Sequence, residues 1–299
     1  MTNLLLFLEA PALLVQVLLD GILIGAIYAL AAYGMALVWG VMNIVNVVQG
    51  ELVILGGYLA IMFSGLGVSA FLTVPLAAAA LFALGWVMYA GVVFRVTGKD
   101  MFVSLLATFG LSILIAQLIN QIWGADVRSL DAELGSWLIL DSVVTISRAR
   151  VAALAAALVL GAALVVFLRT SRLGRAIRAT AQNARAARAL GVDTDWVYAA
   201  TYAINGAICG AAGALIAMIW VIHPFAGLVF TIRAFAIVIL AGLGNLALVI
   251  AAALGLGAAE NFVGFVLGAQ FQGAFVFSLL VAILVWRSRR LARSRKVLR

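Results

Sequence analysis

The stretch DGILIGAIYALAAYGMALVWGVMNIVNVVQGELVILGGYLA, residues 20–60, holds two apolar runs on either side of a short polar segment. The first run approaches the length of a membrane-spanning helix, which needs roughly 20 apolar residues. The polar segment contains Asn43, Asn46, Gln49 and Glu51 and is too polar to face lipid. Irregular backbone at membrane depth is tolerated only against protein or a water-filled cavity. We therefore expect one helix to end here and another to begin, inside a helical bundle.

The composition of the whole chain is that of a membrane protein. Hydrophobic residues make up 67% of it and charged residues 10%, and the mean hydropathy is +1.23. Such values exclude an ordinary soluble domain. The N-terminus lacks a basic region, carries Glu9 and leads into an apolar run too long for a cleaved signal peptide. We expect the first span to be retained.

Apolar windows predict an all-α polytopic membrane protein with about eight or nine transmembrane helices, some of them broken. The spans are expected near residues 13–39, 47–63, 70–94, 101–123, 151–168, 196–222, 234–266 and 273–286. Glycines interrupt the run 234–266, which is long enough for two short helices. We expect residues 1–299 to form a single transmembrane domain.

The basic residues gather in two blocks, within residues 169–188 and 287–299. Lys and Arg beside membrane spans mark cytoplasmic segments and also attract anionic lipid. We therefore place the loop 171–195 and the basic tail 287–299 in the cytoplasm, and the acidic segment 124–142 outside. A cytoplasmic tail then requires nine crossings if the N-terminus lies outside. Because the charges do not form one phosphate-binding face, no nucleic-acid partner is expected.

Few residues are available for catalysis or metal binding. The chain has no G-x-x-x-x-G-K-[ST] motif for ATP, so it is not expected to be an ATPase. With one histidine, His223, and one cysteine, Cys209, it lacks the parts of zinc sites, catalytic triads and disulfides. We expect no cofactor and no metal in this chain. His223 precedes Pro224, which favours a structural turn over a proton relay.

Three acidic residues, Asp20, Glu51 and Glu260, lie within apolar sequence. A charge near the centre of a bilayer costs roughly 2.5 to 3.5 kcal/mol on insertion scales, so each acid is a functional candidate. The alternatives are an interfacial position for Asp20, and helix capping or an interhelical hydrogen bond for the two glutamates. Glycines four residues apart, at 21 and 25, 206 and 210, and 264 and 268, predict close helix crossings.

We predict that Asn43, Asn46, Gln49 and Glu51 build or gate a translocation path. A hydrogen-bonded network needed only for folding is the alternative. A second polar group follows in the sequence. Gly242, Gly244 and Asn245 are predicted to form a helix break, because glycine weakens a helix by about 1 kcal/mol relative to alanine. Glu260 and Asn261 are predicted on a following helix that faces the bundle, with plain close packing as the alternative.

Three segments together resemble one protein family. Residues 20–60 are similar to the start of permease subunits of branched-chain amino-acid ABC importers, the H-type subunit in particular. GRAIRATAQNARAARALGVDTDWVYAATYAINGAICGAAGALIA, residues 174–217, resembles the cytoplasmic loop and following span of that family. AFAIVILAGLGN, GLGAAEN and the residues between them, 234–261, resemble its last third. The similarity covers roughly residues 21–285 in consistent order.

The resemblance implies the ABC-importer permease fold in a bacterial cytoplasmic (inner) membrane. It also implies a related M-type permease, two cytoplasmic ATPases that use ATP and Mg, and an external or periplasmic solute-binding protein as partners. Glu51 falls on the family's Gly-Glu pair, and residues 242–244 fall on its Gly-rich break. The chain departs from the family at Gln49, where relatives usually carry His, at Gln182 and Asn183, where they often carry acids, and in its basic tail.

Other functions remain open at this point. The same superfamily includes permeases for urea, sugars and nucleosides. An ion-coupled secondary transporter would also explain buried acids, but it would function without a separate ATPase. A membrane-embedded enzyme is disfavoured because no nucleophile and base occur together.

The arginine stretch is predicted to be the element that couples the chain to an ATPase. A helix from Arg175 to Leu190 would place Arg175, Arg178, Arg185 and Arg188 within one arc of about 140°. Alanines with Ile177 and Leu190 would form a docking face, and Gly174 and Gly191 would bound the helix. Asp193 or Thr194 would cap the next span. The alternative is a solvated loop that touches anionic lipid.

Overall fold

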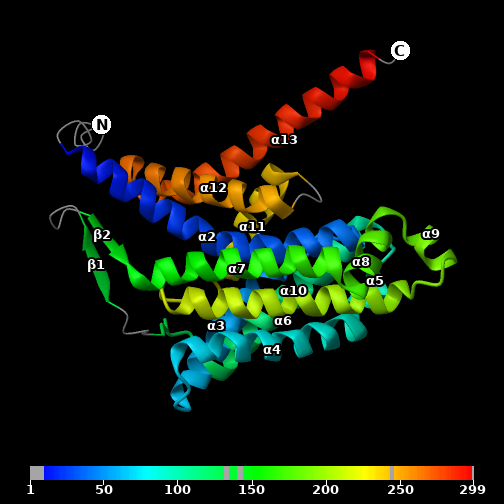
Figure 1. The fold of residues 1–299 in the computed structure, drawn as a ribbon, viewed down its shortest axis with the longest axis horizontal. Helices are drawn as coiled ribbons and strands as arrows, with labels where there is room; N and C mark the ends of the chain where they lie inside the picture. Colours follow the sequence, from blue (N-terminus) through cyan, green and yellow to red (C-terminus); the bar gives the residue numbers. More distant parts are fainter. Residues whose placement is uncertain (1–9, 131–134, 140–143, 243–245, 298–299) are drawn as a thin grey trace.

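The computed structural model describes residues 10–130, 135–139, 144–242 and 246–297, and its helices run mainly along the long axis of the molecule (Figure 1). The helices are α2 (Pro11–Met42), α3 (Gln49–Gly65), α4 (Ala70–Met88), α5 (Phe94–Val96), α6 (Met101–Trp123), α7 (Arg148–Thr170), α8 (Arg172–Gln182), α9 (Ala184–Ala189), α10 (Thr194–Ala217), α11 (Gly227–Ala241), α12 (Leu246–Leu267) and α13 (Phe271–Val297). A π-helical turn, Tyr89–Val93, joins α4 and α5 into one span. Strands β1 (Ser136–Ile139) and β2 (Val144–Ser147) form an antiparallel hairpin.

Six of the described helices are long and apolar enough to cross a membrane, and three shorter apolar helices accompany them. The predicted all-α membrane fold is confirmed, whereas the small hairpin was not predicted. The run 234–266 divides into α11 and α12, in agreement with the expected break. However, α11 begins at Gly227 rather than at residue 234, and it therefore includes Arg233.

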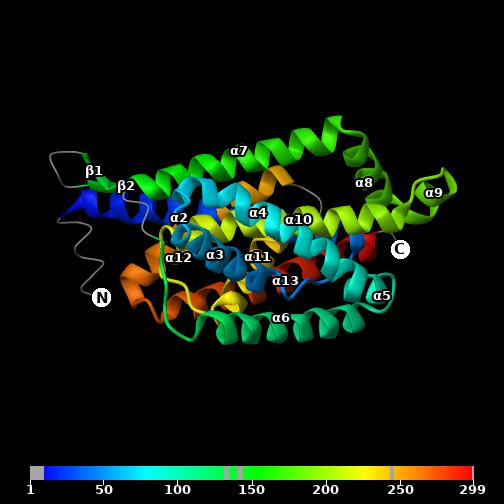
Figure 2. The same cartoon turned by 90° about the horizontal axis from the view of Figure 1, so that it is seen from below.

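The two ends of the bundle differ in what they carry (Figure 1). The hairpin lies at one end, together with the start of α2, and we call this the hairpin end. Helices α5, α8 and α9 lie at the other, which we call the arginine end because α8 and α9 contain the arginine stretch. Helix α13 leaves the bundle and carries the basic tail away from it. Seen from below, α6 and α7 lie on opposite sides of α10 (Figure 2).

Helix α10 is the centre of the bundle. Within its apolar span 83% of the residues are buried, against 33% for α6 and 28% for α7. Small residues make this position possible, since they let backbones approach closely. Gly210 lies against Ala77 of α4, and Gly213 lies against Val53 and Gly57 of α3.

Two of the three predicted glycine pairs lie at helix crossings. Gly21 and Gly25 of α2 face the backbone of α12, and Gly206 and Gly210 of α10 face α4. The third prediction is wrong. The atoms nearest to a methyl group on Gly264 belong to the side chain of Gln272 in α13 and not to a backbone, and Gly268 follows the end of α12 with φ of 111°.

Gly213→Ala is expected to destabilise the chain, because the added methyl group would collide with the backbone of Val53 and Gly57. Overpacking of this kind costs about 1–3 kcal/mol. Gly255→Ala is the matched control, since its methyl group would meet no atom within 4 Å. The temperature at which the detergent-solubilised chain loses its monodisperse elution peak should fall for Gly213→Ala and not for Gly255→Ala. Equal temperatures for the two variants would contradict the packing described for α10.

Candidate functional site

The polar segment after α2 re-enters the bundle without helical structure. Helix α2 ends at Met42, and Asn43 adopts a left-handed conformation with φ of 54°. Its N–H donates to the carbonyl oxygen of Trp39 at 3.0 Å, while its side chain is exposed. Asn43 therefore terminates α2 and lies apart from the buried polar residues with which the sequence grouped it.

Helix α3 begins halfway along its neighbours. The side-chain nitrogen of Gln49, its first residue, donates to the carbonyl oxygen of Ala31 in α2 at 2.8 Å. It also lies 3.1 Å from the sulfur of Cys209 in α10. Ala31 and Cys209 are both far from the ends of their helices, so the start of α3 lies deep in the bundle.

Asn46 and Gln49 belong to one buried network. The hydroxyl of Tyr202 in α10 donates to Asn46 Oδ1 at 3.1 Å, and Asn46 Nδ2 donates to Gln49 Oε1 at 3.0 Å. All three side chains are buried. These contacts form an interhelical network that holds the start of α3 between α2 and α10. Tyr202 was not predicted, because α10 is apolar or small on most positions and gives no pattern that marks a polar partner.

Two threonines hold the backbone of the re-entrant segment. The Thr231 hydroxyl of α11 donates to the carbonyl oxygen of Val47 at 3.0 Å and accepts from the Gly50 N–H at 2.9 Å. The Thr108 hydroxyl of α6 accepts from the Val47 N–H at 3.2 Å and lies 3.0 Å from the Val45 carbonyl oxygen. Buried backbone groups outside a helix need such partners. Helices α6 and α11 therefore fix this segment.

Glu51 lies at the N-terminus of α11. A methyl group on Gly227, the first residue of α11, would collide with the Glu51 carboxyl group, so the two residues are in direct contact. The N-cap residue Ala226 provides no side-chain cap, and helix N-termini favour acceptors and negative charge. Ser112 of α6 is close enough to hydrogen bond with the carboxyl group. Within the described residues, Glu51 Oε2 is buried without a hydrogen-bond partner.

Glu260 faces the bundle, as predicted, and pairs with Arg233 of α11. Arg233 Nε lies 3.0 and 3.1 Å from the two carboxyl oxygens, and Nη2 also binds Oε1. The guanidinium lies over the ring of Tyr28 at 5.0 Å, and the Tyr28 hydroxyl lies near Glu260. Arg233 was not predicted as a site residue, although it is the only Lys or Arg between Arg188 and Arg287 and therefore stands out in the sequence.

The second predicted helix break is visible in part. Helix α11 ends at Ala241, and Gly242 follows with φ of 80°. The next described helix, α12, begins at Leu246. Gly244 and Asn245 lie outside the described residues.

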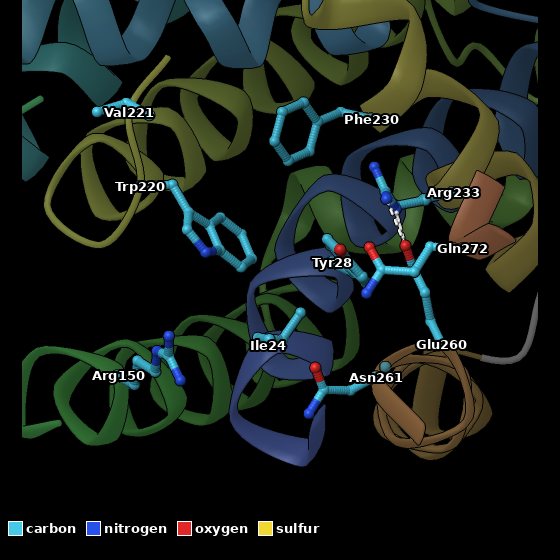
Figure 3. A pocket seen from close by; sticks show the side chains of 11 residues that line it. Ile24, Tyr28, Arg150, Trp220, Val221, Phe230, Arg233, Glu260, Asn261 and Gln272 are labelled. Atoms are coloured by element: carbon cyan, nitrogen blue, oxygen red, sulfur yellow. Dashed lines mark hydrogen bonds and ion pairs between the residues drawn. The ribbon is translucent and has the colours of Figure 1, made fainter. Parts of the chain in front are cut away.

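A cavity of about 400 Å³ lies beside the Arg233–Glu260 pair. Figure 3 shows Tyr28 near the middle of the view, with Trp220 and Phe230 on one side and the ion pair on the other. The ring of Tyr28 is 6.2 Å from that of Trp220 and 6.5 Å from that of Phe230. The cavity therefore joins an aromatic wall to a charged one.

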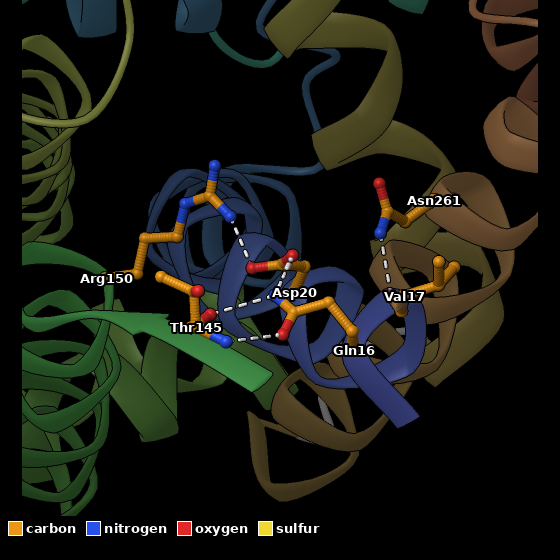
Figure 4. A network of polar contacts seen from close by, with 6 residues as sticks. All are labelled: Gln16, Val17, Asp20, Thr145, Arg150 and Asn261. Atoms are coloured by element: carbon orange, nitrogen blue, oxygen red, sulfur yellow. Dashed lines mark hydrogen bonds and ion pairs between the residues drawn. The ribbon is translucent and has the colours of Figure 1, made fainter. Parts of the chain in front are cut away.

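Asp20 is paired at the hairpin end (Figure 4). Its carboxyl group lies 2.5 Å from Arg150 Nη1 and accepts from Gln16 Nε2 at 2.7 Å. The Gln16 amide also pairs with the backbone of Thr145 in β2, with both distances 2.9 Å. Asn261 of α12 donates to the carbonyl oxygen of Val17 at 2.7 Å. These contacts tie the hairpin, α7 and α12 to α2, and Arg150 also lines the cavity.

The arginine stretch forms two helices, so the prediction of one helix from Arg175 to Leu190 is wrong. Asn183 interrupts it, and its side chain caps α9 by accepting from the Ala186 N–H at 3.0 Å. Arg175 and Arg178 lie on α8, whereas Arg185 and Arg188 lie on α9. The four arginines therefore do not share one continuous helical face.

The predicted docking face is also divided. Ile177 is 1% exposed because α8 packs this side chain into the bundle, whereas Leu190 is 86% exposed. Gly174 does not begin the helix. It lies inside α8, where a methyl group would collide with the backbone of Phe167 and Leu168 at the end of α7.

The end of the stretch matches the prediction. Gly191 has φ of 86°, and the Asp193 carboxyl group caps α10 by accepting from the Asp195 and Trp196 N–H groups at 3.1 and 3.0 Å. Arg188 Nη2 donates to the Thr194 hydroxyl at 2.5 Å and lies 3.6 Å from Asp195. Arg188 therefore connects α9 to α10.

Residues 17–284 match the family described as "Branched-chain amino acid transport system / permease component". A high-affinity branched-chain amino acid transport system permease protein of Salmonella typhimurium is 28% identical over 284 residues, covering 90% of this chain and 92% of the relative. Its counterpart in Pseudomonas aeruginosa is 29% identical over 286 residues, with coverages of 91% and 93%. A probable branched-chain amino acid transport permease protein of Methanocaldococcus jannaschii is 23% identical over 295 residues, with coverages of 90% and 88%. No solved structure matches the chain.

Proposed function

Because the chain belongs to the family of permease components of branched-chain amino acid transport systems, we propose that it is one membrane-spanning half of an ATP-driven importer for branched-chain amino acids. In this proposal it pairs with a related M-type permease in a bacterial cytoplasmic membrane. Two cytoplasmic ATPases use ATP and Mg, and a solute-binding protein delivers the amino acid from outside. The chain itself supplies the path and the surface that the ATPases move.

The observation that carries the proposal is the meeting of two helix starts inside the bundle. Helix α3 begins at Gln49, deep between α2 and α10, and α11 begins beside Gly50. The Glu51 carboxyl group contacts Gly227, the first residue of α11. In transporters, discontinuous helices whose ends meet at membrane depth form binding and gating sites. We place the path along Asn46, Gln49 and Glu51.

The remaining path residues follow from the direction of the helices. We place Glu260 on the path nearer the hairpin end. Asn43 and Gly242 follow the ends of α2 and α11, and we place them on the path toward the arginine end. Gly244 and Asn245 stay a prediction from the sequence. The ring of Trp39, near the end of α2, stacks on that of Phe235 in the middle of α11 at 5.1 Å, so the last turn of α2 packs on α11.

The arginine end is placed in the cytoplasm, with the C-terminal tail, on the basis of its Lys and Arg content. Leu190→Cys and Val127→Cys test this, because the two positions are 86% and 63% exposed at opposite ends and the native Cys209 is buried. A membrane-impermeant maleimide should label Val127→Cys in intact cells. It should label Leu190→Cys only after the membrane is opened. The reverse pattern would invert the orientation.

Uptake in a host that lacks its own branched-chain amino acid importers tests the whole proposal. Cells that express the chain with its partner subunits should accumulate labelled leucine, isoleucine and valine, and should stop when the ATP site of the ATPase is mutated. Excess urea, ribose or adenosine should not compete. Uptake by vesicles that contain this chain alone and an ion gradient would instead indicate a secondary transporter.

A further inference from the structure

The cavity beside Tyr28 combines two balanced ion pairs with an aromatic wall. Resting on the proposed import of amino acids, we propose that this cavity is a binding site for the amino acid inside the permease. The α-carboxylate lies toward Arg150 and Arg233, and the ammonium group lies toward Glu260 and the ring of Tyr28. The aliphatic side chain packs on Trp220 and Phe230, which line the same cavity.

The charges of the lining favour a ligand with no net charge. Arg233 is paired with Glu260, and Arg150 is paired with Asp20. Adding a single anion or cation to two neutral pairs would leave an uncompensated charge in the apolar bundle, which is costly. A zwitterion brings one charge of each sign, so both ends find a partner and the total stays zero.

The ion pairs can accept such a ligand without being broken. Glu260 is bound by Nε and Nη2 of Arg233, and a guanidinium has five N–H donors in all. A second carboxylate can therefore bind the same guanidinium. Within the described residues, Glu260 Oε2 is contacted only by the shared Nε–H of Arg233 at 3.1 Å, so this oxygen keeps a lone pair for an ammonium group.

The aromatic wall selects an apolar side chain. The rings of Trp220 and Phe230 flank that of Tyr28 at 6.2 and 6.5 Å, and Ile24 completes the wall. A volume of about 400 Å³ lies within the range of roughly 300–1,000 Å³ that is usual for small-molecule sites. Urea, sugars and nucleosides lack the carboxylate and ammonium groups for which this lining is charged.

The position of the cavity suits an early stage of import. Its lining comes from the middle of α2, the start of α7, the loop after α10, and the facing parts of α11, α12 and α13 (Figure 3). Val221 in that loop is 64% exposed. In α2, Tyr28 lies nearer the hairpin end than Ala31, the residue beside which α3 begins. A ligand released at the hairpin end therefore meets this cavity before it reaches Glu51 in the first turn of α3.

Leucine binding to the assembled permease–ATPase complex in lipid nanodiscs, without the solute-binding protein, tests the site. Ile24→Trp should fill the cavity and weaken binding of labelled leucine more than tenfold, while both ion pairs stay in place. Ile113→Trp is the matched control, since Ile113 is an exposed apolar residue of α6. Val221→Trp narrows the same cavity from an exposed position and should also weaken binding, so the test survives a failure of Ile24→Trp to assemble.

Two analogues test the chemistry of the site. Leucinamide lacks the carboxylate and 4-methylpentanoate lacks the ammonium group, and each should compete at least tenfold more weakly than leucine. Equal competition by either analogue, no leucine binding, or binding that is indifferent to both cavity variants would overturn the site. Leucine uptake by cells distinguishes a failure of the site from a failure of the proposed function. If the wild type takes up leucine normally but gives any of those three results, the cavity is not the binding site and the importer proposal stands. If the wild type takes up no leucine, the importer proposal is refuted and the site with it.

Discussion

The double variant Arg178→Glu with Arg185→Glu is expected to release the partner ATPases and to reduce uptake to background. Both side chains are exposed at the arginine end, one on α8 and one on α9. If acidic groups of an ATPase face them, charge reversal places like charges together, which costs several kcal/mol and corresponds to a loss of binding of more than a hundredfold. Arg188 is left unchanged because it connects α9 to Thr194 and Asp195 of α10.

The matched control is Arg95→Glu with Arg289→Glu, which reverses the same number of charges on two other exposed positions. Co-purification of the ATPases with the tagged permease, measured at equal amounts of inserted chain, separates the possibilities. We expect loss of the ATPases only for the α8 and α9 variant. Retention of the ATPases by both variants would leave attraction to anionic lipid as the role of the arginines.

Docking on α8 and α9 can transmit movement because both helices are attached to the bundle. Helix α8 continues from α7 through Ser171, packs Ile177 into the core and places Gly174 against the end of α7. Helix α9 is fixed through Arg188 to α10, the central helix. A push on this pair therefore reaches α7 and α10 directly, whereas a loose basic loop would absorb it.

Local sequence signals predicted the helix breaks well. The polar residues after Met42 and the glycine at 242 each mark the end of a helix, because polar backbone at membrane depth needs protein partners and because glycine accepts a positive φ. The break at Asn183 had a signal too, since Asn is a strong N-cap residue. The prediction of one continuous helix did not take this N-cap residue into account.

The partners of the polar residues could not be predicted in the same way. Glu260 and Arg233 lie on different helices, and the contact of Glu51 with Gly227 depends on how α3 and α11 are packed. Helices α2 and α10 are apolar or small on nearly all sides, so their sequences do not indicate which face meets which neighbour. The spacing of the glycines showed which parts of a helix can approach a neighbour closely, but it did not identify the neighbouring helix.

Glu51→Gln is expected to reduce uptake about thirtyfold while the amount of assembled complex stays the same. The carboxyl group lies on the first residue of α11, a helix that has no side-chain cap of its own. A negative charge at a partly buried helix N-terminus is worth up to about 2 kcal/mol, a factor of about 30 in the balance between two conformations. Glutamine keeps the shape of the side chain and removes that interaction.

Gly227→Ala attacks the same contact from the other helix, because its methyl group would displace the Glu51 carboxyl group. We expect it to lower uptake as well. Asp126→Asn is the matched control, an acid-to-amide change at an exposed position of the hairpin end that should leave uptake unchanged. Initial rates of leucine uptake, divided by the amount of assembled complex, decide the outcome. If Glu51→Gln and Gly227→Ala lose uptake only in proportion to the loss of assembled complex, the contact serves folding and the path must run elsewhere. If the uptake rate per assembled complex falls, the junction of the two helix starts takes part in each transport cycle.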